Sequence, residues 1–263
     1  METNEIDIYI IIRLLTTTKT TTKMKKTLMI AAMMLATALT ASAQYDAGTW
    51  SLAIRYGGSG GTMTETPDLQ IANAMGTQSI ITLPAGTIGA SATAGRTIGF
   101  ELERQMTDRF SMSMGLDWIT AGTGWESHKW TADGIEYKLE DASIKTRYLA
   151  VPVLANFYVW RGLALHVGVQ PAYLLRARQE GKVTFDHNGD YQLSMDRGCK
   201  SDFNKFDFSI PVGISYEWRS HLFLDARYNF GVTNVNKEKT SEGKDQQNLM
   251  LQLTIGYKFN LSD

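Results

Sequence analysis

Two glutamates stand at a spacing that could do chemistry. Glu101 and Glu103 lie two residues apart, which places both carboxylates on the same face of a β-strand. Neighbouring carboxylates can act as general acid and base, for example in the hydrolysis of glycosidic bonds. The structural alternative is that both neutralise arginine or lysine side chains in a buried interior. The elements that carry these residues favour the structural alternative.

The other reactive side chains form no recognisable catalytic pattern. No HExxH motif, nucleophile elbow, Walker loop or EF-hand is present, and Ser127 and His128 lack the base or orienting group that an acyltransferase or protease needs. No metal-binding spacing relates the four histidines, which are His128, His166, His187 and His221. We therefore expect no catalytic, metal-binding or cofactor-binding residues, no cofactor and no enzymatic activity.

Composition limits the classes of partner and redox chemistry. The 263 residues carry 26 Lys and Arg against 27 Asp and Glu, a net charge of -1, so no basic field exists to attract nucleic acid. The single cysteine, Cys199, excludes an intramolecular disulfide and a cysteine-based metal cluster. Abundant glycine (23) with scarce proline (5) suits long strands with tight bends. One domain, and no nucleic-acid partner, is expected.

The N-terminus reads as an export signal. From Met24, two lysines precede an apolar stretch from Leu28 to Leu39 and the sequence Ala41-Ser42-Ala43, which predicts a signal peptide over residues 24–43. Its apolar stretch is too short to remain as a spanning helix, so we expect cleavage before Gln44. Residues 1–23 are interpreted as an extension from a start codon placed too early, or as an unusually long n-region. Residues 44–263 form the predicted mature domain.

Alternation with a period of two recurs through the mature chain. From Leu249 to Phe259 every odd position is apolar, whereas Gln252, Thr254 and Lys258 lie on the other face. The same pattern predicts eight strands, at residues 50–56, 98–102, 110–118, 144–158, 163–173, 206–218, 222–230 and 249–259. The sequence therefore predicts an all-β fold.

The lengths of the connections indicate how these strands are joined. Residues 105–109, 160–162 and 219–221 are tight connections, and they alternate with four long ones at residues 58–91, 122–141, 177–203 and 231–248. An eight-stranded antiparallel up-and-down β-barrel produces this order, with short periplasmic turns, long outside loops and both termini on the periplasmic side.

The direction of the apolar face distinguishes a transmembrane barrel from a soluble periplasmic barrel that binds a ligand inside. The other face is rich in Gly, Ser and Ala with scattered charges, aromatic residues cluster at strand ends, and long loops occur at one rim only. These features favour a transmembrane barrel in the outer membrane. The predicted interfacial aromatics are Trp50, Trp118, Trp160, Trp218, Tyr228, Tyr257 and Phe259.

Side chains just fill the interior of an eight-stranded barrel, so charged residues of the polar face are expected to pair there. The predicted polar network of the lumen comprises Arg55, Glu101, Glu103, Arg147, Asp207, Glu217, Asp225, Arg227 and Lys258.

Several segments resemble the Bacteroidetes outer-membrane β-barrel family that includes porin-family and PorT-like barrels. They are YLAVPVLANFYV (148–159), GVQPAYLLRAR (168–178), FDFSIPVGISYEW (206–218), DARYNFGVTNV (225–235) and GYKF (256–259). The alternating end of the chain, closing on Tyr257 and Phe259, also resembles the signal that barrel assembly machinery recognises, although Asn260–Asp263 follow it. The resemblance implies a protein of the cell envelope.

These patterns predict an outer-membrane barrel with a packed lumen and a structural or surface-binding role through its long extracellular loops. The alternatives are an accessory role in protein secretion, as in PorT-like barrels, a narrow pore, an outer-membrane enzyme and a soluble periplasmic ligand-binding barrel. The expected partners are outer-membrane lipid, the barrel assembly machinery, and a surface ligand or envelope protein.

Overall fold

The computed structural model describes residues 45–65, 69–72, 80–83, 89–132, 135–186, 190–237 and 243–261. The predicted N-terminal extension (1–23) and signal peptide (24–43) lie outside these residues. The barrel strands are β1 (Trp50–Met63), β4 (Ala90–Thr107), β5 (Phe110–Trp125), β7 (Ile135–Ala150), β8 (Val153–Trp160), β9 (Leu163–Asp186), β11 (Phe206–Glu217), β12 (Leu222–Gly231) and β13 (Asn248–Asn260). The remaining elements are β2 (Leu69–Ala72), β3 (Ile80–Leu83), β6 (His128–Ala132), β10 (Asp190–Gly198) and the 3-10 helix η2 (Lys200–Asp202).

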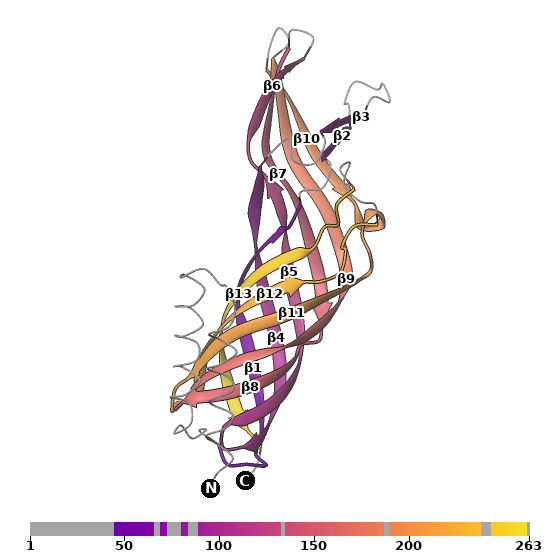
Figure 1. Cartoon of the computed structure of the whole chain (residues 1–263). Helices are drawn as coiled ribbons and strands as arrows, with labels where there is room; N and C mark the ends of the chain where they lie inside the picture. The colour runs from indigo at the N-terminus through magenta and orange to yellow at the C-terminus, as the bar shows by residue number, and fades with distance from the viewer. Residues whose placement is uncertain are drawn as a thin grey trace, which may run out of the picture.

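Antiparallel pairing closes the strands into a barrel (Figure 1). Strand β1 pairs with β4 on one side and with the last strand β13 on the other, where Ser51 lies opposite Asn260. Strands β7 and β8 occupy one place in the ring, because both pair with β5 and β9 and only Val151 and Pro152 separate them. In the part of the chain that the structure describes, the ring has eight strand positions. The predicted eight-stranded up-and-down barrel is confirmed.

Three short connections lie at the end of the barrel where β1 begins. They join β4 to β5, β8 to β9 and β11 to β12, as the sequence predicted. Gly162 in the second connection has φ 74°, a left-handed conformation that glycine adopts without steric cost. By the usual architecture of such barrels, this end faces the periplasm.

The apolar face of each strand points outward. On β13, Leu253 is 56% exposed, whereas its neighbours Gln252 and Thr254 are 0% and 3% exposed. A soluble barrel with an apolar interior would require the opposite arrangement. Within the described residues, no helix is long and apolar enough to span a membrane. The predicted interfacial aromatics lie on this outer surface: Trp50, Trp118, Trp160, Trp218, Tyr257 and Phe259 are exposed, and Tyr228 is half-buried.

Strands rise far above the barrel on the opposite, extracellular side (Figure 1). The predicted loops at residues 122–141 and 177–203 are largely strand, because β9 continues to Asp186 and pairs with both β7 and β10, while β6 pairs with β7. The prediction of loops was wrong here because β-bulges shift the register between Glu140 and Ser143 and again between Arg147 and Tyr148, which interrupts the alternation along the sequence. We call the sheet β6–β7–β9–β10 the extracellular sheet.

Candidate functional site

The central layer of the lumen is a network of ion pairs. Arg55 on β1 donates from Nε to Asp117 Oδ1 at 3.2 Å, also bonds this carboxylate through Nη2, and places Nη1 3.5 Å from Asp225 Oδ1. Arg227 on β12 donates from Nη2 to Glu101 Oε2 at 2.8 Å and places Nε 3.0 Å from Asp225 Oδ1. All five residues are buried. Two guanidinium groups therefore hold three carboxylates taken from β4, β5 and β12.

His166 on β9 completes this layer. Its Nε2 lies 3.4 Å from Asp225 Oδ2, and its ring occupies the space beside Gly213, where a Cβ would lie 2.1 Å from Nε2. Glycine at position 213 thus lets an imidazole enter a crowded interior. Both arginines approach Asp225 at Oδ1, and the histidine lies beside its other oxygen.

A second charged layer lies nearer the periplasmic end. Lys258 Nζ on β13 donates to Glu103 Oε2 at 2.8 Å and lies 3.0 Å from Glu217 Oε2. The other oxygen of Glu103 accepts hydrogen bonds from Ser111 and Tyr158, each at 2.5 Å. One ammonium group therefore joins two carboxylates. Two neutral hydroxyl groups supply the remaining hydrogen bonds of the Glu103 carboxylate.

Tyr45, which precedes β1, covers this layer from the periplasmic side. Its hydroxyl donates to Glu217 Oε1 at 2.6 Å and lies 2.8 Å from His221 Nδ1 in the β11–β12 turn. Burial, together with the neighbouring Glu217 carboxylate, raises the pKa of the Tyr45 phenol far above its ordinary value. The phenol is therefore a hydrogen-bond donor at neutral pH.

Between the charged layers there is room for little more than water. A cavity of about 30 Å³ is lined by side chains that include Glu101, Glu103, His166, Asp225 and Lys258. A water molecule needs roughly 10–15 Å³ of such volume. No substrate of ordinary size fits beside these carboxylates.

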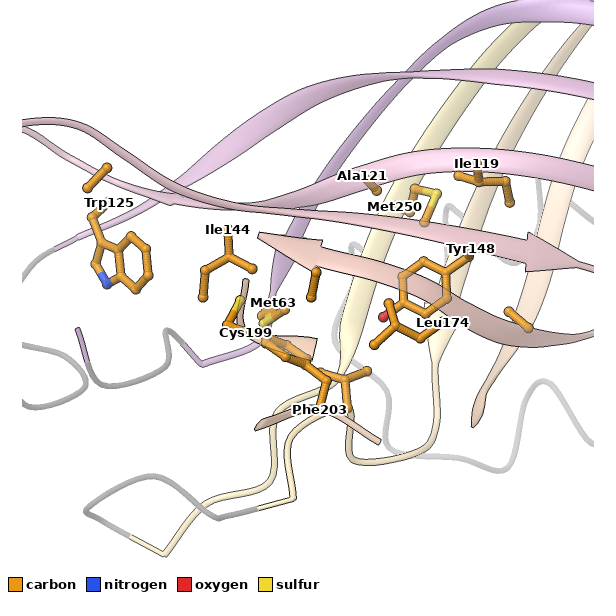
Figure 2. Close-up of a cluster of buried hydrophobic side chains, with 14 of the residues drawn as sticks. Met63, Ile119, Ala121, Trp125, Ile144, Tyr148, Leu174, Cys199, Phe203 and Met250 are labelled. Atoms are coloured by element: carbon orange, nitrogen blue, oxygen red, sulfur yellow. The ribbon is translucent and has the colours of Figure 1, made fainter. Parts of the chain in front are cut away.

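An apolar cluster closes the lumen above the charged layers (Figure 2). Strand residues Ile119, Ile144, Tyr148 and Leu174 face inward there and are at most 4% exposed. Met63 at the end of β1 belongs to the same cluster, as do Cys199, Phe203 and Val235 from the connections of the extracellular side. We call these eight residues the apolar plug.

Cys199 belongs to this plug and lies outside the barrel strands. It is 2% exposed, and burial raises the pKa of its thiol to about 11. The thiol is therefore protonated and shielded at neutral pH, as expected of a small apolar side chain.

The structure brings most of the predicted lumen residues together. Arg55, Glu101, Glu103, Glu217, Asp225, Arg227 and Lys258 are buried and joined by ion pairs. Asp207 is also buried, but its carboxylate accepts hydrogen bonds from Asn248 and Thr233, at 2.7 Å each, instead of pairing with an arginine.

The prediction for Arg147 was wrong. This residue is exposed on the outer face of β7, while its neighbours Thr146 and Tyr148 point into the lumen. Near this point the lumen holds apolar side chains, such as Ile144 and Leu174, together with polar ones, so the polarity of a side chain no longer indicates which face it occupies. Asp117 and His166 were missed by the sequence analysis, although each stands on the polar face of an alternating strand.

The arrangement supports structural ion pairing and offers no open position for chemistry. Each carboxylate of the Glu101 and Glu103 pair already has a cation and a serine hydroxyl, the latter from Ser113 and Ser111 respectively. Among the described residues, no group of three or more His, Cys, Asp or Glu side chains is placed to hold a metal ion.

A closed antiparallel barrel with an apolar outer surface defines the class of membrane-spanning β-barrel proteins. Residues 42–237 match the family described as "Outer membrane protein beta-barrel domain". The chain belongs to this family and is an outer-membrane β-barrel protein.

Solved barrels also match at low sequence identity. Ail, the attachment invasion locus protein of Yersinia pestis, is 15% identical over 81% of this chain and 99% of that chain, with a TM-score of 0.36. OprG from Pseudomonas aeruginosa is 12% identical over 81% and 98%, with a TM-score of 0.38. The outer membrane protease OmpT from Escherichia coli is 9% identical over 81% and 97%, with a TM-score of 0.35. No curated protein matches the chain significantly. Matches this distant transfer no function.

Proposed function

We propose that this protein is a non-conducting surface protein of the outer membrane, which acts through the sheet and loops that it displays outside the cell. The observation that carries the proposal is the filled lumen. Two layers of buried ion pairs and the apolar plug leave a cavity of only about 30 Å³ between the charged side chains. A hydrated ion or small solute would have to break these contacts in order to pass.

The extracellular sheet is the surface that we assign to binding. An open groove of about 860 Å³ is lined by residues of this sheet, among them Lys145, Glu180, Lys182 and Asp196, and by the upper ends of β4 and β5. A groove with charges of both signs suits a polar surface ligand or an envelope protein. These are the partners that we propose, and a nucleic acid is not among them because the chain has no basic excess.

We further propose the route by which the barrel reaches the membrane. The signal peptide over residues 24–43 is cleaved before Gln44, and the barrel assembly machinery recognises the last strand through Tyr257 and Phe259. The outward position of both aromatics on β13 supports this assignment. The PorT-like barrels of Bacteroidetes are the proposed relatives.

Conductance measurements test the proposal. The refolded barrel is added to planar lipid bilayers, next to a variant in which Ile119→Gly and Leu174→Gly remove two side chains of the apolar plug. The native protein is expected to give no stepwise current. The variant loses part of the apolar plug but keeps both charged layers, so it gives stepwise current only if these layers also let ions pass. Regular channel steps from the native protein would refute a closed lumen and favour the narrow pore.

The accessory role in secretion predicts a different phenotype. Deletion of the gene would then remove secreted cargo from the medium while leaving other outer-membrane proteins in place. A surface-binding protein predicts an unchanged set of secreted proteins and lost binding of its ligand or partner to whole cells.

A further inference from the structure

Three arginines form a row on the outer surface of the barrel. Arg96 on β4, Arg147 on β7 and Arg176 on β9 are all exposed and point away from the lumen. Thr120 on β5 lies between the first two in the row, because it is the register partner of Arg147. The row crosses four neighbouring strand positions along one register line, which slopes with the tilt of the strands.

This arrangement places like charges next to each other. Arg147 and Arg176 are direct cross-strand partners, and such pairs destabilise a sheet when nothing lies between them. Among the residues that the structure describes, none of the three guanidinium groups has a hydrogen-bond or ion-pair partner. An anion bound between them would remove the repulsion.

The next pair along the same two strands is different. Lys145 and Arg178 are also cross-strand partners, but Lys145 Nζ lies 2.6 Å from Glu180 Oε2 and Arg178 pairs with Asp196. The chain therefore supplies acidic partners to the upper pair and none to the row of arginines below it.

A groove lies within the row. Its open volume of about 380 Å³ is lined by the guanidinium-bearing residues Arg96 and Arg147, by Thr120, and by Tyr56, Ile98 and Trp118. The two arginines and the threonine hydroxyl can donate hydrogen bonds to one phosphate group. The apolar and aromatic residues lie on the periplasmic side of these donors. Ile98 comes two residues after Arg96 on β4, which runs toward the periplasm, and Trp118 comes two residues before Thr120 on β5, which runs away from it.

The floor of the groove is continuous with the lipid-facing surface. Ile98 pairs with Trp118, and Trp118 pairs with Leu149 on the same outer face. Ile98 and Trp118 are 48% and 46% exposed, as the outward apolar residues of the other strands are. On β4, β7 and β9 these arginines are the first charged outward residues above the apolar surface, a position that suits the headgroup region of the outer leaflet.

We propose that this groove binds the phosphorylated glycolipid of the outer leaflet. A phosphate lies between Arg96 and Arg147 and accepts a hydrogen bond from Thr120, an acyl chain lies over Ile98 and Trp118, and Arg176 binds a further anionic oxygen. The site is separate from the extracellular sheet and from the lumen, and it rests on the outer-membrane location alone. It anchors the barrel in the outer leaflet.

The test uses bisphosphorylated lipid A as the probe. The purified barrel in detergent micelles is titrated with lipid A, with lipid A whose phosphates have been chemically removed, and with inorganic phosphate, and bound lipid is counted by native mass spectrometry. The double variant Arg96→Gln/Arg147→Gln is expected to bind lipid A about tenfold more weakly or worse, because it loses charge-assisted bonds to phosphate.

A matched control carries the same change of charge at the other end of the barrel. Arg161→Gln/Arg219→Gln alters two exposed arginines in periplasmic turns and is expected to bind lipid A as the native protein does. The difference in gel mobility between boiled and unboiled samples shows whether each variant is folded. If the double variant does not fold, the single variant Arg147→Gln takes its place.

Three outcomes would overturn the proposal. They are equal binding of intact and dephosphorylated lipid A, unchanged binding in the arginine variants, and full displacement of lipid A by inorganic phosphate, which would indicate a site for free anions. Selective loss of lipid A binding in the arginine variants supports it, whatever the conductance of the barrel.

Discussion

Replacement of Arg55 is the most informative change in the lumen. The side chain is completely buried, and its guanidinium group lies within ion-pair distance of Asp117, Asp225 and Glu101. Arg55→Met keeps much of the apolar volume of the side chain and removes the charge. Asp117 then loses the cation that holds it, and three carboxylates depend on Arg227 alone.

The expected loss of stability follows from that imbalance. Removal of one partner from a buried ion pair costs about 3–5 kcal/mol, because the remaining charge is left without compensation in a poorly solvated interior. We expect the free energy of unfolding to fall by this amount. The double variant Arg55→Met/Asp117→Asn removes one charge of each sign and is expected to recover about half of the loss; together with the single variant Asp117→Asn it completes the cycle that measures the coupling of the two residues.

Equilibrium unfolding in urea, with the barrel in lipid vesicles and tryptophan fluorescence as the signal, gives these free energies. Arg161→Gln in an exposed periplasmic turn is the control and is expected to change stability by less than about 0.5 kcal/mol. A loss below about 1 kcal/mol for Arg55→Met would refute the reasoning, since the network would then contribute no more than an exposed ion pair.

Three further changes test other parts of the molecule. Leu174→Ala in the apolar plug, where the side chain is 0% exposed, should lower the free energy of unfolding by about 2–5 kcal/mol in the same urea experiment. Leu253→Arg should cost up to about 2–4 kcal/mol in vesicles, because Leu253 lies on the apolar, lipid-facing surface; an unchanged midpoint would contradict a lipid-facing position. Alkylation of Cys199 should be slow at neutral pH and should accelerate as the pH approaches its pKa of about 11. Because the folded protein holds this proton more tightly than the unfolded thiol, with a pKa of about 8.5, the thiol stabilises the fold fully below about pH 8.5 and loses that contribution as the pH rises toward 11. Rapid alkylation at pH 7 would mean that the plug is open.

The barrel itself could be predicted because its two faces meet different surroundings. Lipid selects apolar side chains outside, and the crowded lumen tolerates polar and small ones, so Leu253 and Gln252 alternate as the sequence suggested. The tight connections also stood out, since a turn such as that at Gly162 leaves little room between two alternating strands.

The extracellular part could not be predicted in the same way. Above the membrane both faces of β7 and β9 meet polar surroundings or protein, so lipid no longer imposes alternation on the strands. Bulges next to Asp141 and Arg147 then shift the parity of the remaining residues. The result was that paired strands were predicted as loops.

The candidate lumen network was predictable where the interior is charged and failed where it is apolar. Asp225, Arg227 and Lys258 alternate with outward apolar residues, which placed them inside. Arg147 stands beside the plug, where Tyr148 points inward and the arginine outward. The plug itself draws residues such as Phe203 from connections far apart in the sequence, and only the folded chain reveals that association.

The most direct test of the central claim, a lipid-facing barrel with a filled lumen, compares two adjacent residues of β13. In a Cys199→Ala background, Leu253→Cys is labelled with a small fluorescent thiol reagent while unfolded and is then folded into vesicles that contain nitroxide-labelled lipid, whereas Gln252→Cys is folded first and then treated with the reagent. We predict that the fluorophore at position 253 is strongly quenched by the lipid, whereas the cysteine at position 252, a site with 0% exposure, is not labelled until the protein unfolds. Labelling at position 252 with no quenching at position 253 would contradict the account, because it would place the apolar face of the barrel away from lipid.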